Sequence, residues 1–219
     1  MEPKRVVTLA DIERAAGGSR GPLVVAAADA LAAGVGARTV VFVEGISDRA
    51  AVQSLAERRG RDLRAEGVAV LPIGGATSIG RFLDQFGPAG ADVRLAGLVD
   101  AAEEPSFRRG LERAGLADSP TRADLEALGF FVCVEDLEDE LIRALGTDEV
   151  ERVVHAQGDR RALRTLQQQP AQLGRAPEQQ LRRFMGTTSG RKIAYARHLV
   201  DALDPAGVPR PLDRLLHHL

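Results

Sequence analysis

The stretch that decides the fold is Val40-Val41-Phe42-Val43-Glu44-Gly45-Ile46-Ser47-Asp48. It begins as an apolar, β-branched run, which predicts a buried strand. Glu44 ends this strand, Gly45 makes a turn, and Asp48 lies at the start of a predicted helix, where Ser47 or Asp48 is the expected cap. Open parallel α/β sheets bind their ligands at the carboxyl ends of the strands, so both carboxylates lie where such a sheet would place a functional site.

A second strand repeats this arrangement further along the chain. Residues 93–99 form another apolar run, and Asp100 follows it directly. We expect Glu44, Asp48 and Asp100 to converge at one edge of the sheet. Three carboxylates held close together repel one another unless a cation lies between them, and a divalent metal ion is the usual cation. The pattern therefore predicts a metal site at this edge.

Strands and amphipathic helices alternate through the middle of the chain, which is typical of a parallel sheet built from βαβ units. The predicted strands are residues 39–43, 68–72, 93–99 and 130–134, and the helices after them are about 48–59, 78–86, 105–114 and up to 145. No strand is evident after residue 146, where we predict helices at 148–156, 159–168, 178–185, 191–203 and 211–218. The predicted fold is α/β, with a four-stranded parallel sheet flanked by helices and an all-helical C-terminal region.

These elements divide the chain into three predicted parts. Residues 1–37 are a helical lead-in with candidate helices at 9–16 and 23–33, residues 38–145 form the α/β domain, and residues 146–219 form the helical region. The helical region carries Lys192. Of 29 basic residues in the chain, only Lys4 and Lys192 are lysines, and the other 27 are arginines. In this arginine-rich background, a lysine far from the terminus indicates a role that arginine does not fill.

Composition excludes several classes of protein. A hydrophobic fraction of 44% and a charged fraction of 27% are ordinary for a soluble globular protein. No apolar stretch approaches the roughly 18 residues that span a bilayer, and the N-terminus lacks a signal-peptide pattern, so we expect a cytoplasmic protein without membrane contact. The single cysteine, Cys133, excludes an internal disulfide and a cysteine-cluster zinc site, and we expect it in the core. A net charge of −2 gives no overall attraction to nucleic acid.

Asp136 and Glu138 lie in the acidic stretch 135–140 that follows the last predicted strand. They are either metal ligands at the sheet edge or acids that the positive end of a helix dipole favours. We expect Glu135 and Glu140 to be solvated. The arginine groups, such as Arg160-Arg161-Arg164, either track a nucleic-acid backbone or form solvated helix faces, and for any single arginine the second reading is the stronger one.

Together these motifs resemble the Toprim domain, which topoisomerases, bacterial primases, small RNA-maturation nucleases and the overcoming-lysogenization-defect (OLD) nucleases share. The pattern is most similar to the OLD group. The matching segments are Val43-Glu44-Gly45-Ile46-Ser47-Asp48, Pro72-Ile73-Gly74-Gly75, Asp136-Leu137-Glu138, Lys192 in a helical tail, and the ending from Ile193-Ala194-Tyr195-Ala196 to Val208-Pro209 and Leu212. The resemblance implies a Toprim-like (Rossmann-like) fold over residues 38–145.

The resemblance also implies a chemistry. Glu44, Asp48 and Asp100 would hold one Mg²⁺ or Mn²⁺, and Asp136 and Glu138 would help to hold a second ion. Glu44 and Lys192 would be catalytic, with Lys192 placed against the scissile phosphate or the leaving group. Arg191 and Lys192 would contact the nucleic acid. Such a site would cut or nick DNA, although a metal site alone does not distinguish ribose from deoxyribose, so RNA is an alternative substrate.

Two departures from the OLD pattern are visible. No phosphate-binding Gly-x-x-x-x-Gly-Lys-Ser/Thr loop is present, so a separate ATPase subunit is a candidate partner in DNA repair or phage defence. A homodimer is also expected if both strands of a duplex are cut. The Asp-x-Asp motif of the third strand reads Asp100-Ala101-Ala102, and Glu103 is the candidate substitute for the missing acid. Ala102 therefore keeps a second hypothesis open, in which the domain binds nucleic acid or a protein without cleaving.

Overall fold

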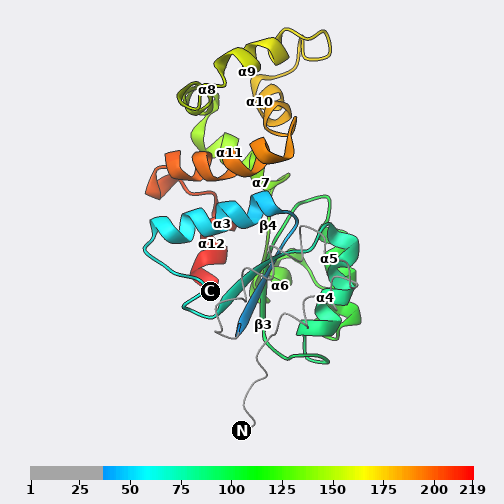
Figure 1. Ribbon diagram of the computed structural model, residues 1–219. Helices are drawn as coiled ribbons and strands as arrows, with labels where there is room; N and C mark the ends of the chain where they lie inside the picture. The colour runs from blue at the N-terminus through cyan, green and yellow to red at the C-terminus, as the bar shows by residue number, and fades with distance from the viewer. Residues whose placement is uncertain (1–36) are drawn as a thin grey trace.

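The computed structural model describes residues 37–219 and has a four-stranded parallel sheet at its centre (Figure 1). The strands are β1 (Thr39–Val43), β2 (Val68–Pro72), β3 (Arg94–Val99) and β4 (Phe130–Val132). Their order across the sheet is β2-β1-β3-β4, and every neighbouring pair is parallel. The predicted α/β fold class is confirmed. The candidate lead-in helices at 9–16 and 23–33 lie outside the described residues.

Both faces of the sheet are buried, which explains why the strands are continuously apolar. Successive side chains of a strand point to opposite faces. Val41 and Val43 therefore join one hydrophobic cluster, while Val40 and Phe42 join another. The second cluster packs β1 against α4 (Ile79–Phe86), α5 (Glu104–Arg113) and α6 (Arg122–Ala127). The first cluster packs the opposite face against α3 (Ile46–Arg58), α7 (Leu137–Leu145) and the C-terminal helices.

The C-terminal helices are α8 (Thr147–Ala156), α9 (Arg160–Gln167), α10 (Pro177–Met185), α11 (Ser189–Ala202) and α12 (Arg210–His218). No strand interrupts them between residues 146 and 219, as predicted. In Figure 1, α8, α9 and α10 lie at the end of the molecule farthest from the sheet, while α11 runs beside α3 and α12 returns to the sheet.

Two differences from the predicted elements lie around β4. Helix α6 was not predicted, because it has only six residues and its signal is a local capping box in which Thr121 and Asp124 exchange hydrogen bonds. Strand β4 ends at residue 132 and not at 134. The Cys133 N–H still donates to the Val99 carbonyl at 2.8 Å, but the Val134 N–H turns away and donates to the Glu140 carboxylate at 2.7 Å.

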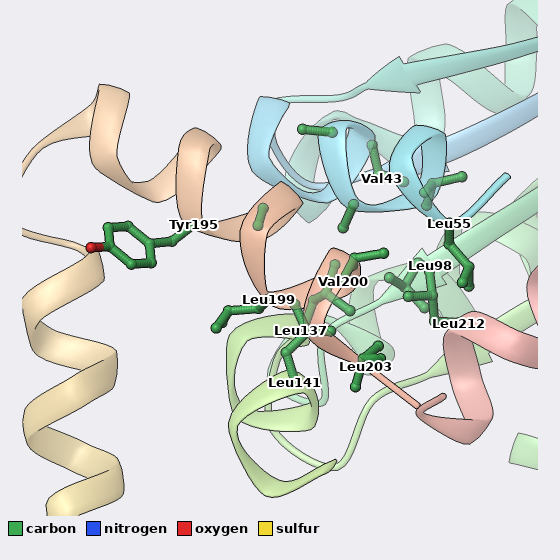
Figure 2. Packing of buried hydrophobic residues seen from close by; sticks show 14 of the residues in the cluster. Val43, Leu55, Leu98, Leu137, Leu141, Tyr195, Leu199, Val200, Leu203 and Leu212 are labelled. Carbon is green, nitrogen blue, oxygen red and sulfur yellow. The ribbon is translucent and has the colours of Figure 1, made fainter. Parts of the chain in front are cut away.

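The helical region shares its core with the α/β domain. Leu199 and Val200 of α11 are fully buried in the same cluster as Val43 and Leu55, and Figure 2 shows Leu199 near Leu137 and Leu141 of α7. Polar contacts strengthen this seam, because Ser54 Oγ donates to Asp201 at 2.7 Å. The packing of α11 on α3 therefore fixes the position of Lys192 relative to the strand ends.

Among residues 37–219, no helix has both the length and the apolar character needed to cross a membrane.

We predict that Leu199→Ala destabilises the protein by about 2–5 kcal/mol, because it removes a fully buried side chain from the α11–α3 seam and leaves a cavity. Urea unfolding followed by circular dichroism measures this change. Leu173, which is 68% exposed, is the matched control, and Leu173→Ala should change the stability by less than about 0.5 kcal/mol. If the two substitutions lowered the stability equally, this would contradict a hydrophobic core shared by the helical region and the α/β domain.

Candidate functional site

Glu44 and Asp100 meet at the carboxyl edge of the sheet. Glu44 follows β1 directly, and Asp100 follows β3, the parallel neighbour that pairs with β1 in the register Phe42↔Gly97. Their side chains come close enough to share a hydrogen bond. Because two carboxylates share a hydrogen bond only when one holds a proton, this contact favours a protonated Asp100.

Asp100 is the most strongly perturbed acid of the site. Burial, the hydrogen bond with Glu44, and the negative charges of Asp48, Glu44 and Asp136 together raise its pKa from 3.8 to about 9. Each of these causes penalises the ionised carboxylate. The raised pKa of Asp100 therefore reflects its burial first, and then its hydrogen bond with Glu44 and the negative charges around it.

Asp48 lies in the first turn of α3, which begins at Ile46 and therefore earlier than predicted. The N-cap is Gly45, so the expectation of Ser47 or Asp48 as the cap is wrong; Asp48 lies within the first turn, where its Oδ2 accepts the Gly45 N–H at 2.8 Å. The side chain is only 6% exposed. Burial first, and then the charge of Glu138, raise its pKa to about 7, although the Gly45 hydrogen bond and Lys192 act in the opposite direction.

Asp136 and Glu138 bring two further carboxylates from the start of α7. Asp136 is the helix cap, since its Oδ1 accepts the Asp139 N–H at 2.9 Å, and it also pairs with Arg182 of α10. Glu138 is 7% exposed, and burial raises its pKa even though Lys192 lies 3.2 Å away. We call Glu44, Asp48, Asp100, Asp136 and Glu138 the carboxylate cluster.

Lys192 enters the cluster from α11. Burial works to lower its pKa, but the charges of Glu138, Asp48 and Glu44 outweigh burial, so the pKa of Lys192 is raised. The ammonium group is therefore a permanent positive charge beside the acids. The chain brings this lysine from the helical region to the strand ends, as the sequence predicts.

Glu103 is held beside the turn after β2. Its Oε1 accepts the Ala76 N–H at 2.9 Å, which ties it to the turn after β2. Burial raises its pKa, the Ala76 hydrogen bond lowers it, and the charge of Glu44 raises it again, so Glu103 lies within electrostatic reach of the cluster. Ala102 itself is exposed. Gly74 and Gly75, in the turn after β2, both have positive φ angles, 72° and 107°, which glycine adopts without strain.

Arg191, the other predicted nucleic-acid contact, faces away from the acids. Its guanidinium lies over the Phe184 ring at 4.4 Å and pairs with Asp159 at 3.4 Å. It therefore lies among α9, α10 and α11, whereas its neighbour Lys192 contacts Glu138. Its role in binding nucleic acid stays a prediction.

Two residues of the site region were not foreseen. Arg182 neutralises part of the acidic stretch through Asp136 and Glu135, and no local pattern reveals this pair because α10 lies 46 residues beyond Asp136. Glu140 was expected to be solvated, and this is wrong. It is 5% exposed, because it caps the free Val134 N–H and pairs with Arg143 at 2.9 Å. Cys133 is buried as expected.

The carboxylate cluster offers oxygen ligands that suit a hard divalent cation, although these carboxylates do not already form a metal site. Five carboxylates face two cations, Lys192 and Arg182, so the cluster keeps an excess of negative charge, which adds to burial in raising the pKa of both Asp48 and Asp100. Oxygen ligands of this kind suit Mg²⁺ or Mn²⁺. Within residues 37–219, however, no three His, Cys, Asp or Glu side chains already form a group that could hold a metal ion. Asp136 and Glu138 are instead engaged by Arg182 and Lys192.

We predict that Asp48→Asn and Asp100→Asn stabilise the metal-free protein increasingly as the pH rises. Both acids have folded-state pKa values above the ordinary 3.8, so their contribution to stability is complete below pH 3.8 and is lost as the pH rises through the folded pKa. The advantage of Asp48→Asn should level off near pH 7 and that of Asp100→Asn near pH 9, with the larger plateau for Asp100→Asn because its pKa is raised further. The free energy of unfolding of variant and wild type, measured with urea in EDTA from pH 3.8 to pH 9, gives this advantage.

Glu104 is the control for this experiment, because its pKa is shifted in the opposite direction. Hydrogen bonds from Arg122 and Arg108 lower its pKa, so its stabilising effect is complete above the ordinary value of 4.5. The loss caused by Glu104→Gln should therefore stay constant between pH 6 and pH 9. An Asp48→Asn advantage that is equally constant would contradict the raised pKa of Asp48 described here.

Comparisons with known proteins agree with this geometry. Residues 37–100 match the family model for the TOPRIM domain of overcoming lysogenization defect protein-like proteins. The C-terminal region of the Xanthomonas campestris pv. campestris OLD protein has 25% sequence identity and a TM-score of 0.65, covering 83% of this chain and 91% of that chain. The C-terminal region of the Burkholderia pseudomallei OLD protein has 22% identity and a TM-score of 0.64, covering 83% and 96%. A search of curated proteins gave no significant match. Residues 37–100 therefore resemble the TOPRIM domain of OLD-like proteins, and the chain has a Toprim-like fold similar to that of the C-terminal regions of OLD proteins.

Proposed function

We propose that this protein is a metal-dependent phosphodiesterase that cuts or nicks DNA at the carboxylate cluster. The observation that carries the proposal is the contact between Glu44 and Asp100 in a buried, acidic environment that also holds the ammonium group of Lys192. The negatively charged carboxylates alone would repel a phosphodiester. Lys192 and a bound cation are therefore both needed for the substrate to bind.

The residues of the site have distinct tasks in this proposal. Glu44, Asp48 and Asp100 would hold one Mg²⁺ or Mn²⁺, and Asp136 and Glu138 would help to hold a second. Metal ions bound there would make a water molecule more acidic and neutralise charge on the phosphate. Lys192 would place a compact positive charge against the phosphate or the leaving oxygen, and its raised pKa keeps it charged at neutral pH.

Binding of a metal would require Glu138 and Asp136 to exchange partners. Glu138 now pairs with Lys192, and Asp136 pairs with Arg182. Release of these pairs would free two carboxylates for a cation and two cationic side chains for a phosphate. A separate ATPase subunit and a homodimer remain proposed partners, and RNA remains the alternative substrate.

We predict that purified protein nicks supercoiled plasmid in Mg²⁺ or Mn²⁺, and that Glu44→Gln lowers the rate at least about a hundredfold because a central metal ligand loses its charge. Agarose gels of the plasmid over time measure this. Asp139→Asn is the matched control, since Asp139 belongs to the same acidic stretch but pairs with Arg143 at 2.7 Å. Wild-type protein that is as inactive as Glu44→Gln would remove the proposed activity.

The second candidate function is a module that binds nucleic acid or a protein without cleaving. It is favoured by Ala102, which is exposed and places no acid where the OLD pattern has one, while Glu103 is tied to the Ala76 N–H.

Titration calorimetry with Mn²⁺ separates the two candidates. We predict tight binding that Asp100→Asn abolishes and that Ala102→Asp strengthens about tenfold or more, because the substitution adds a carboxylate oxygen to the site. If Asp100→Asn bound Mn²⁺ with the same heats as the wild-type protein, or if the wild-type protein bound no Mn²⁺ at millimolar concentration, the non-cleaving module would be favoured.

A further inference from the structure

Arg182 of α10 closes one end of the carboxylate cluster. Its guanidinium forms a fork, in which Nη1 donates to Glu135 at 2.8 Å and Nη2 donates to Asp136 Oδ2. The other oxygen of Asp136, Oδ1, accepts the Asp139 N–H at 2.9 Å. Both oxygens of Asp136 therefore already accept hydrogen bonds, and one of the two donors carries a full positive charge.

The loop that carries Asp136 is fixed beside the loop that carries Asp100. The Ala101 N–H donates to the Glu135 carbonyl at 2.8 Å, which ties the residues after β3 to those after β4. The charge of Asp136 is also one of the causes that raise the pKa of Asp100. Asp136 therefore lies within electrostatic reach of the acids that follow β1 and β3.

The two ends of the carboxylate cluster are neutralised differently. We call Glu44, Asp48 and Asp100 the first position, and Asp136 and Glu138 the second position. Among residues 37–219, ion pairs reach only the second position, from Arg182 and Lys192. A divalent cation at the first position would displace no ion-paired side chain of this part of the chain, whereas one at Asp136 would meet the Arg182 guanidinium at close range. Like charges at such a distance repel each other strongly.

The Arg182 guanidinium has room to turn while its helix stays in place. Leu181, Phe184 and Met185, which flank Arg182 on α10, are at most 1% exposed, so the helix is anchored in the core. The Arg182 side chain is 43% exposed. Rotation about its side-chain bonds would move the charge away from Asp136 and into solvent without a change of fold.

We propose that Arg182 is a gate on the second position. While its guanidinium pairs with Asp136, a divalent cation binds at the first position only, and the second position fills once Arg182 has turned away. This inference rests on the proposed function and deepens it, because it gives the order in which the two positions of the same site fill. Lys192 is not the gate, since it contacts Glu138 and leaves Asp136 to Arg182.

Titration calorimetry of the full chain with Mn²⁺ alone tests the gate without any substrate. The wild-type protein should bind one Mn²⁺ well and a second one weakly. Arg182→Gln should tighten the second step at least about fivefold, which is an ordinary coupling between two sites, with a much smaller change in the first step. Electron paramagnetic resonance gives an independent readout, because two Mn²⁺ ions roughly 4 Å apart have coupled spins.

Three further variants show whether the effect arises at Asp136. Arg183→Gln is the matched control, because Arg183 is the next residue of α10, is exposed, and forms no ion pair within the described part of the chain. Arg182→Lys keeps the positive charge and should tighten the second step less than Arg182→Gln does. Asp136→Asn, added to Arg182→Gln, should remove the gain, because the two residues act through one contact.

The outcomes separate the gate from the proposed activity. A second step that tightens in Arg182→Gln but not in Arg183→Gln, and that Asp136→Asn reverses, supports the gate. Equal Mn²⁺ affinities and stoichiometries in the wild-type protein and Arg182→Gln overturn the gate and leave metal-dependent cleavage standing. A gain that Asp136→Asn does not reverse would come from the overall charge, and it also overturns the gate. If neither protein binds Mn²⁺, the gate and the metal-dependent activity are both overturned.

Discussion

Repulsion between carboxylates at the end of a parallel sheet is the constraint on which the rest of this structure depends. Strands β1 and β3 are neighbours in register, so the residues that follow them, Glu44 and Asp100, are forced together. Helix α3 adds Asp48 within the next turn, where it is almost completely buried. Because the backbone brings these acids together, their repulsion destabilises the folded state at neutral pH. Such a cost is typical of sites that bind a cation or catalyse a reaction.

The helical region offsets part of this repulsion. Lys192 of α11 pairs with Glu138, and Arg182 of α10 pairs with Asp136 and Glu135. Both cations come from residues far along the chain, and the hydrophobic core that α10 and α11 share with α3 and α7 sets where they lie. The shared hydrophobic core is therefore part of the site, because it holds the positive charges beside the negative ones.

Much of this arrangement could be predicted from the sequence because parallel sheets obey strong local rules. Buried β-branched runs indicate the strands, and a carboxylate directly after a strand must lie at the carboxyl edge, which placed Glu44 and Asp100 correctly. Lys192 stood out only because this chain uses arginine almost everywhere else. The pairing of Arg182 with Asp136 could not be predicted, since it depends on how α10 packs. The burial of Glu140 was missed for a related reason, because β4 ends early and leaves the Val134 N–H to be capped.

A crystal of the wild-type protein soaked in Mn²⁺ tests the central claim most directly, through the anomalous scattering of manganese. The account predicts a peak bound by oxygen atoms of Glu44, Asp48 and Asp100, with the Asp136–Arg182 and Glu138–Lys192 pairs loosened when a second ion binds. Manganese absent from the strand ends, with Glu44 and Asp100 still sharing their hydrogen bond at saturating metal, would contradict it. The fold would then stand as Toprim-like, with a cluster of carboxylates that serves a purpose other than metal binding.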